Sequence, residues 1–228
     1  AYGILPFILT SIYGTAGAIL IGVPIGFLTA VFLSKVAPPK VAAVIRPAVD
    51  LLAGIPSVVY GLVGMIILVP GIQKAFGLSS GACLLAAILV LAIMILPTVI
   101  NISETSIRAV PAGIKSSSLA LGASHVQTIF RSILPAAKSG IVTAIVLGVG
   151  RAIGEAMAIT LVSGSSVNVP LPFNSVRFLT TAIVSEMGYS SGLHRQVLFT
   201  IGLVLFVFIM IINIVLNKIL KKGADDNE

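Results

Sequence analysis

The sequence predicts an all-α integral membrane protein, and three observations support that fold class. Hydrophobic residues make up 57% of the 228 residues and charged residues only 9%, whereas soluble domains carry about 25% charged residues. Five apolar stretches reach the ~20 residues that a helix needs to cross a bilayer. The basic residues gather at the ends of these stretches rather than on one soluble face, which excludes a nucleic-acid-binding domain.

The five spans are expected within residues 4–33 and at about 49–69, 81–100, 139–162 and 197–219. Pro24 lies inside the first stretch and predicts a kink or a break, because proline removes a backbone donor. Pro56 interrupts the second stretch near its start and predicts a kink there, where Ser57 can satisfy the carbonyl that the proline frees. The single cysteine, Cys83, lies in an apolar stretch and excludes an internal disulfide.

Lysine and arginine positions predict the orientation of the spans. Ten of these residues lie between spans one and two, between spans three and four, or after span five, whereas three lie in the other two connections. The positive-inside rule places the richer side in the cytoplasm, so the C-terminus is expected inside and the N-terminus outside. That arrangement leads us to expect that one N-terminal span of a six-span protein is missing from this chain.

The longest inside connection, residues 101–138, predicts two short helices outside the bilayer. One is expected at about 116–121, with Gly122 as its stop. The second has apolar residues at offsets 0, 3, 4, 7 and 8, which form one helical face, and Pro135 is expected to end it. This face either packs against the chain's own spans or docks into a groove on a cytoplasmic partner; it comprises Val126, Ile129, Phe130, Ile133 and Leu134.

The same connection carries a family motif. Its segment SSSLALGASHVQTIFRSILPAAKSG resembles the coupling loop of ABC-importer permeases, whose pattern is Glu-Ala-Ala, three residues, Gly, and a Leu-Pro pair twelve residues later. Gly122, Leu134 and Pro135 match that spacing, whereas Ser116 stands where the family has glutamate. The resemblance implies that this loop contacts an ATPase through Ser116, Ala120, Gly122, Ala123, Ile129, Phe130, Leu134 and Pro135.

Four further segments resemble one subfamily, the C-type permease subunit of phosphate importers (the PstC family). They are IPSVVYG at 55–61, LAIMILP at 91–97, GRAIGEAMAIT at 150–160 and SGLH at 191–194. The resemblance covers essentially all 228 residues and implies a single permease domain with the type I ABC-importer (MetI-like) fold. Residues 101–138 are then the cytoplasmic coupling loop, and residues 164–195 an extracytoplasmic loop that caps the path and meets the binding protein.

The resemblance also implies the partners and the location. A permease of this family pairs with a second, A-type permease subunit, stands on two cytoplasmic ATPase subunits and receives phosphate from an extracytoplasmic binding protein, in the bacterial cytoplasmic membrane. The sequence has no GxxxxGK[ST] phosphate loop. We therefore expect no enzyme activity and no cofactor on this chain, with ATP and Mg bound by the partner ATPase.

Arg151 and Glu155 are the only charged side chains between residues 139 and 176. A charge at bilayer depth costs about 2.5–3.5 kcal/mol on insertion scales, so the pair must face a protein interior or a water-filled path. On one helix, the i,i+4 spacing allows the two side chains to pair. The pair is either a structural brace or part of the substrate pathway, where Arg151 meets the phosphate anion and Glu155 neutralises it in the empty state.

Several other residues allow local structural predictions. Ser57 and Tyr60 are either ordinary residues of a kinked helix or pore-lining donors to phosphate, and the Gly150–Gly154 spacing favours close helix packing. Arg46 with Asp50, and Glu104 with Arg108, have the i,i+4 spacing of ion pairs. A short surface helix is expected at 175–186. His125 is expected to be exposed in the coupling loop, and with His194 as the only other histidine, no metal site is expected.

Three other classes remain open from the residues alone. A sulfate or molybdate permease shares the fold and the coupling loop, and one arginine suits any small oxyanion. An ion-coupled secondary transporter is less favoured, because no internal repeat is visible and Glu155 is the only mid-membrane acid. A channel is disfavoured because nothing in the sequence resembles a selectivity filter.

Overall fold

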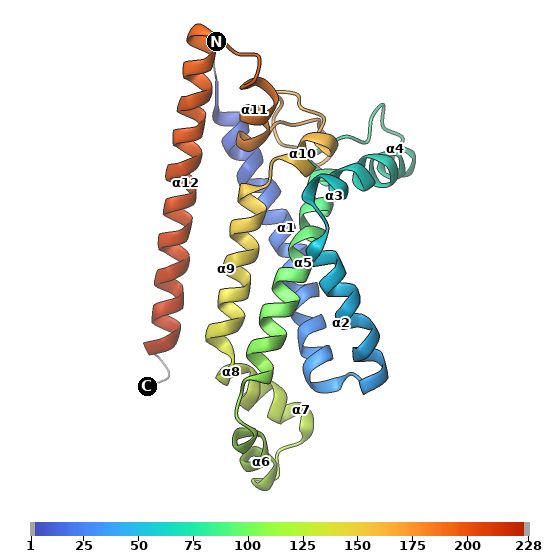
Figure 1. Ribbon diagram of the computed structural model, residues 1–228, viewed down its shortest axis with the longest axis vertical. Coiled ribbons are helices and arrows are strands. Elements are labelled where there is room, and N and C mark those ends of the chain that lie inside the picture. The colour runs from blue at the N-terminus through green and yellow to red at the C-terminus, as the bar shows by residue number, and fades with distance from the viewer. Residues whose placement is uncertain (1–2, 226–228) are drawn as a thin grey trace. The chain divides into compact units, whose positions relative to one another are not determined.

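The computed structural model describes residues 3–225, which form helices and one isolated bridge between Gly164 and Val176 (Figure 1). Four helical stretches are long and apolar enough to cross a membrane: Leu5–Val36, Ser57–Phe76, Leu84–Arg108 and Gly192–Val215. The pair His125–Ala136 and Lys138–Gly154, bent by 70°, supplies a fifth if it is one span. Residues 1–2 and 226–228 of the predicted domain, and the side chains of Lys221 and Lys222, lie outside the described part.

The first span is one unbroken helix. Helix α1 (Leu5–Val31) continues into a π-helical turn, η1 (Phe32–Val36), and Pro24 lies inside α1. The predicted break at Pro24 is therefore wrong, whereas the alternative, a kink, stays a prediction. Proline removes one backbone hydrogen bond, and transmembrane helices tolerate that loss when their surroundings satisfy the freed group.

The second span starts later than predicted. Residues 49–54 belong to a separate helix, α2 (Pro39–Gly54), and the apolar span begins with α3 (Ser57–Val63) and runs through η2 (Gly64–Leu68) and α4 (Val69–Phe76). Pro56 has the extended backbone of a helix N-cap (φ −57°, ψ 139°). Proline also disfavours the helical conformation of the residue before it, so the kink predicted at Pro56 is a complete break.

The third and fifth spans extend beyond their predicted ends. Helix α5 (Leu84–Arg108) passes through Pro97 and takes up the first residues of the predicted coupling loop, and helix α12 spans Gly192–Asp225. The fourth span, predicted as one helix over 139–162, is instead divided into α9 (Lys138–Gly154) and α10 (Met157–Val162).

The described chain divides into two compact units, each formed by three separate segments. The first unit holds the residues up to Gly22, Ile55–Ile95 and Val149–Asn213. The second unit holds Val23–Gly54, Leu96–Gly148 and the residues from Ile214 onward.

Within the first unit, α10 packs between α3 and α11 (Leu179–Glu186) (Figure 1). The predicted short helix at 175–186 thus exists as α11, but it is not a surface helix. Its apolar side is buried because it packs into a core that α1 and α12 also line; that core comprises Phe7, Leu179, Ala182, Leu198 and Ile201.

Within the second unit, the C-terminal part of α5 packs into two hydrophobic cores. One core joins α1, α5 and the coupling loop through Ala30, Val31, Ile107, Ile133 and Ala137. The other joins η1, α2 and α5 through Leu33, Ala42, Val49 and Ile100. The coupling loop folds as α6 (Ala112–Ala120), α7 (His125–Thr128), η3 (Ile129–Ile133) and α8 (Leu134–Ala136).

Candidate functional site

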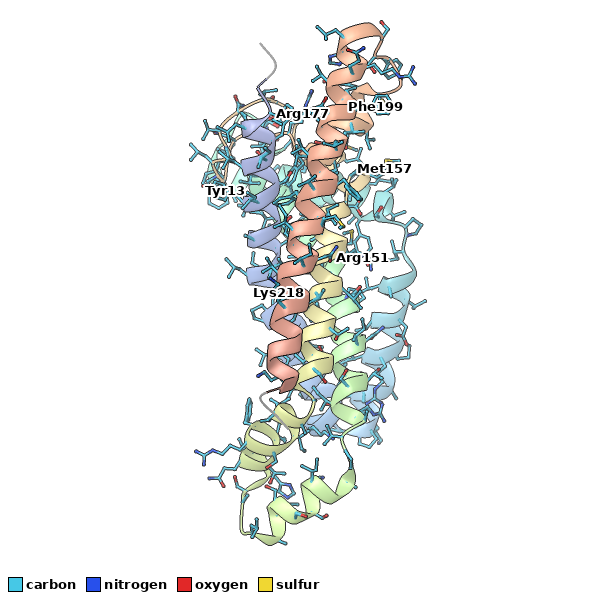
Figure 2. All side chains as sticks on the ribbon, turned by 90° about the vertical axis from the view of Figure 1, so that its left-hand side faces the viewer. Tyr13, Arg151, Met157, Arg177, Phe199 and Lys218 are labelled. Atoms are coloured by element: carbon cyan, nitrogen blue, oxygen red, sulfur yellow. The ribbon has the colours of Figure 1, made fainter. Side chains whose placement is uncertain are left out.

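A break between α9 and α10 lies at the centre of the predicted pathway. Helix α9 ends at Gly154, and the helical conformation resumes at Met157. One carboxylate oxygen of Glu155 accepts the backbone N–H of Ala158 at 2.9 Å, so its side chain caps the start of α10. The Thr180 hydroxyl of α11 donates to the Glu155 carbonyl at 2.7 Å. Figure 2 shows Arg151 and Met157 on either side of this break.

The break corrects the sequence interpretation of Arg151 and Glu155. The predicted i,i+4 face requires one continuous helix, and that helix ends one residue before Glu155. Glu155 therefore directs a carboxylate oxygen to the backbone of α10, where an acid near a helix N-terminus is favourable. Both side chains are partly buried, so each retains some access to solvent.

Helices α3 and α10 approach each other closely at Gly61. A Cβ atom on Gly61 would lie 2.7 Å from both the Cα and the carbonyl oxygen of Ala158. These are backbone atoms of the turn that Glu155 caps, so any larger residue at position 61 would push α3 away from α10. In the sequence, Gly61 is only the last residue of the family segment IPSVVYG, and nothing there indicates this contact.

Tyr60 directly precedes Gly61 on α3. Arg151 lies close enough to Tyr60 for its charge to act on the tyrosine hydroxyl, and Tyr60 is partly buried. Ser57, the first residue of α3, is also partly buried. The four predicted pathway residues thus all belong to the first unit, and a cation and two hydroxyl side chains of this kind provide the donors that a small oxyanion requires.

The predicted packing role of Gly150 and Gly154 is not seen within this chain. No described atom lies within 4 Å of a Cβ placed on either residue, and both are exposed. The close-packed glycine of this region is Gly61 instead, because the break after Gly154 turns α10, rather than α9, onto α3.

In the second unit, one buried acid holds two arginines. The Glu104 side chain is 8% exposed, and its Oε1 atom lies 2.7 Å from Nε of Arg46 and 3.4 Å from Nη1 of Arg108. The predicted Glu104–Arg108 pair is therefore confirmed. The predicted Arg46–Asp50 pair is wrong: Arg46 reaches across to α5, and Asp50 accepts the Asn101 amide at 2.9 Å.

The coupling loop forms a helical hairpin around the predicted stop. Gly122 has a positive φ of 86°, which favours glycine, so the stop is confirmed, although α6 begins at Ala112 rather than 116. Ser124 then caps α7 through a capping box with Gln127. The Ser118 hydroxyl bonds to Thr128 at 3.1 Å and accepts from Ser132 at 3.2 Å, which joins the two arms of the hairpin.

The apolar face of the second arm is buried at one end and exposed at the other. Its inner end is buried with the chain's own core: Ile133 is 1% exposed, and Ile129 and Leu134 pack against the same core. Its outer end is exposed, at 64% for Val126 and 55% for Phe130. Pro135 does not end the helix, because α8 continues to Ala136 before the bend into α9.

The remaining predicted coupling residues line the first arm and the bend. Ser116, Ala120, Gly122 and Pro135 are exposed, and Ala123 is partly buried. The Ser116 hydroxyl donates to the Gly113 carbonyl at 3.0 Å, within its own helix. His125 is exposed, as predicted.

The extracytoplasmic loop predicted at 164–195 is braced by a small charged cluster. Glu186 at the end of α11 pairs with Arg177 and, at 2.7 Å, with Nε2 of His194. Arg177 also donates to the Ser165 carbonyl at 3.0 Å. His194 therefore joins α12 to α11.

Residues 22–224 match the model of the family described as binding-protein-dependent transport system inner membrane component. This chain belongs to that family. It is 41% identical to the probable ABC transporter permease protein YqgH of Bacillus subtilis, with 92% of this chain and 71% of the relative covered. It is 36% identical to the phosphate transport system permease protein PstC of Haemophilus influenzae, over 90% of this chain and 72% of the relative.

Solved structures agree on the fold. The inward-facing MetNI methionine ABC transporter superposes with a TM-score of 0.69 at 19% identity, covering 97% of this chain and 94% of that chain. An amino acid ABC transporter superposes with a TM-score of 0.68 at 21% identity, covering 96% and 92%. The predicted type I importer fold is thus confirmed. An inner membrane component of such a transport system is a transport subunit rather than an enzyme.

Proposed function

We propose that this chain is the C-type permease subunit of a phosphate importer. The observation that carries the proposal is the position of Arg151 beside the α9–α10 break, where it is partly accessible and within electrostatic range of Tyr60. Similarity to phosphate transport permeases named PstC, at 33–36% identity, supports phosphate as the substrate. A sulfate or molybdate permease is the second candidate, since a guanidinium binds any small oxyanion.

Arg151 would hold the anion while the Tyr60 and Ser57 hydroxyls donate to its oxygens. A guanidinium stays charged when desolvated and matches two phosphate oxygens at once. Glu155 supplies the opposing charge when the site is empty, and its cap on Ala158 keeps α10 against α3. If α10 moves, the distance between the Arg151 guanidinium on α9 and the hydroxyl groups of Tyr60 and Ser57 on α3 would therefore change.

The partners follow from the same proposal. A second, A-type permease completes the pathway, an extracytoplasmic phosphate-binding protein delivers the substrate, and two ATPase subunits bind ATP and Mg on the cytoplasmic side, where the C-terminus of this chain lies. No cofactor is assigned to this chain. The exposed outer end of the coupling hairpin, with Leu121 89% exposed beside Val126 and Phe130, would insert into the ATPase.

Phosphate uptake by cells whose only permease carries Arg151→Gln tests the pathway role. We expect uptake to fall by at least about tenfold, because a charged hydrogen bond is worth about 1.5–3 kcal/mol, with the ATPase still captured in a pull-down. Lys74→Gln, which removes an exposed charge of the same unit, should leave uptake unchanged. Normal uptake by Arg151→Gln, or loss of the complex, would return Arg151 to a packing role. Competition by excess sulfate or molybdate identifies the substrate.

The coupling face has its own test. Phe130→Ala should weaken ATPase capture by about tenfold, because exposed aromatic side chains are common binding hot spots. Val36→Ala, an exposed apolar residue of the same unit outside the loop, is the control. Equal capture by both variants would contradict the assignment of this face to the ATPase.

A further inference from the structure

Two arginines contact one buried acid in the second unit, and two lysines lie within electrostatic range of these arginines or of each other. Arg46 and Arg108 both contact the buried carboxylate of Glu104. Lys35 lies within electrostatic range of Arg108 and of Lys115. We call these four basic residues and Glu104 the basic cluster; it carries a net charge of +3.

The two arginines are held by Glu104 and still have unused hydrogen-bond donors. Arg46 uses Nε for Glu104 and Nη2 for the Leu33 carbonyl at 3.0 Å, and Arg108 uses Nη1 for Glu104. Each guanidinium has five N–H donors, so these bonds leave donors on both. The side chains are 34% and 55% exposed, respectively. Glu104 thus holds two partly exposed guanidinium groups in place, and each keeps donors for a further partner.

The single negative charge of Glu104 does not neutralise the positive charges of the four basic side chains. Like charges close together destabilise one another, and Arg46 and Arg108 are held together by a single carboxylate. A bound anion relieves this repulsion. A phosphate group fits best, because guanidinium pairs bind its oxygens in a bidentate manner and lysine adds a point charge.

The position of the cluster indicates where that phosphate comes from. Lys35 lies at the end of the candidate span Leu5–Val36, and Arg108 is the last residue of the span Leu84–Arg108. The turn that carries Lys35 also exposes the apolar side chains of Phe32 and Val36, at 39% and 60%. A span end with basic residues and exposed apolar residues matches a headgroup together with the start of its acyl chains.

We propose that the basic cluster is a binding site for the phosphate group of an anionic phospholipid in the cytoplasmic leaflet. The site is separate from Arg151 and does not depend on which anion the permease transports. It ties the end of α5, from which the coupling loop starts, to the lipid surface. Free inorganic phosphate has the same chemistry, and the experiment separates the two sources.

The test is native mass spectrometry of the delipidated complex of this chain with its partner subunits. Phosphatidylglycerol is added, with phosphatidylcholine as the neutral-headgroup comparison. We expect Lys35→Gln and Arg108→Gln each to weaken phosphatidylglycerol binding by about fivefold, the effect of one basic residue at an anionic membrane surface. Lys40→Gln, an exposed lysine of the same unit, should have little effect, and phosphatidylcholine should not discriminate among the variants.

Two results would overturn the lipid assignment. One is phosphatidylglycerol binding that Lys35→Gln and Arg108→Gln leave unchanged, or that Lys40→Gln weakens equally. The other is inorganic phosphate binding that the two substitutions weaken while lipid binding stays intact, which would place a free anion in the site. Arg108→Gln removes only the longer, more exposed contact to Glu104, and an unchanged elution profile of the complex checks that the fold is retained.

Discussion

Two of the three acid–arginine pairs with i,i+4 spacing show what that spacing can and cannot predict. Glu104 and Arg108 lie on the unbroken helix α5 and contact each other at 3.4 Å. Arg151 and Glu155 lie on either side of a helix end, and Glu155 binds the backbone of α10 instead. Spacing therefore predicts an ion pair only where the helix continues through both residues.

The difference separates a structural cluster from a candidate transport site. Glu104 is 8% exposed and is held by Arg46 and Arg108, so its charge is committed to joining α2 to α5. Glu155 and Arg151 are both partly accessible, and the carboxylate stabilises a helix start. Changes to the first pair should lower stability most, whereas changes to the second should alter transport.

The largest stability effect is expected for Glu104→Gln. Removing one partner of a buried ion pair leaves the other charge uncompensated, which costs about 3–5 kcal/mol. We expect the lower end, about 3 kcal/mol, because Arg46 is one-third exposed and exposure screens its charge. The measurement is the temperature at which half of the detergent-solubilised complex is lost from size-exclusion chromatography after heating.

Arg108→Gln is the matched control for that substitution. Its contact with Glu104 is longer and its side chain is 55% exposed, so the expected loss is about 0.3–0.5 kcal/mol. A Glu104→Gln complex as stable as wild type would show that this acid does not hold the second unit together.

Gly61→Ala is expected to have an intermediate effect. The added Cβ meets backbone atoms of Ala158 at 2.7 Å, and backbone cannot move aside as a flexible side chain does. Overpacking of this kind costs about 1–3 kcal/mol. Unfolding can be followed at Cys83, the single cysteine of the chain, which is buried in the same unit. A thiol dye reacts with Cys83 only when heating exposes it, and this reaction gives the melting midpoint. The partner subunits in the measured complex must lack cysteine.

Gly150→Ala is expected to change the stability in the opposite direction to Gly61→Ala. Position 150 has open space within the described chain, and alanine is favoured over glycine inside a helix by about 0.5–1 kcal/mol. The melting midpoint should therefore rise slightly for Gly150→Ala and fall for Gly61→Ala. Equal shifts in the two variants would contradict the close α3–α10 contact.

The sequence was sufficient for features that depend on local pattern. The apolar stretches predicted the spans, and Gly122 predicted the turn of the hairpin. Pro56 was rightly identified as an interruption, although its strength was underestimated. Each of these features is determined by residues within one or two turns of each other.

Features that depend on distant residues were missed. The Arg46–Glu104 contact joins positions 58 apart, and a nearer acid, Asp50, offered a false partner. The break at Glu155 has no proline to signal it, and the apolar pattern continues across it into α10. The break is held by a side-chain cap and by Thr180, 25 positions away, and a single sequence gives no sign of that contact.

A small stability effect, and the one most informative about transport, is expected at Glu155. Glu155→Ala removes the cap on Ala158 and should cost about 1 kcal/mol, as other N-terminal caps do. Glu155→Gln keeps a side-chain oxygen for the same N–H and should change the Cys83 melting midpoint little. The two variants therefore separate the cap from the charge.

Uptake by the same two variants then decides what the charge does. If Glu155 neutralises Arg151 in the empty site, Glu155→Gln leaves the arginine without its opposing charge, so phosphate should bind more tightly and leave more slowly. We expect both KM and the maximal rate of uptake to fall in Glu155→Gln, with the amount of assembled complex unchanged. Wild-type uptake in Glu155→Gln, together with a loss in Glu155→Ala that follows its lower stability, would restrict Glu155 to the helix cap and leave Arg151 as the charged residue of the pathway.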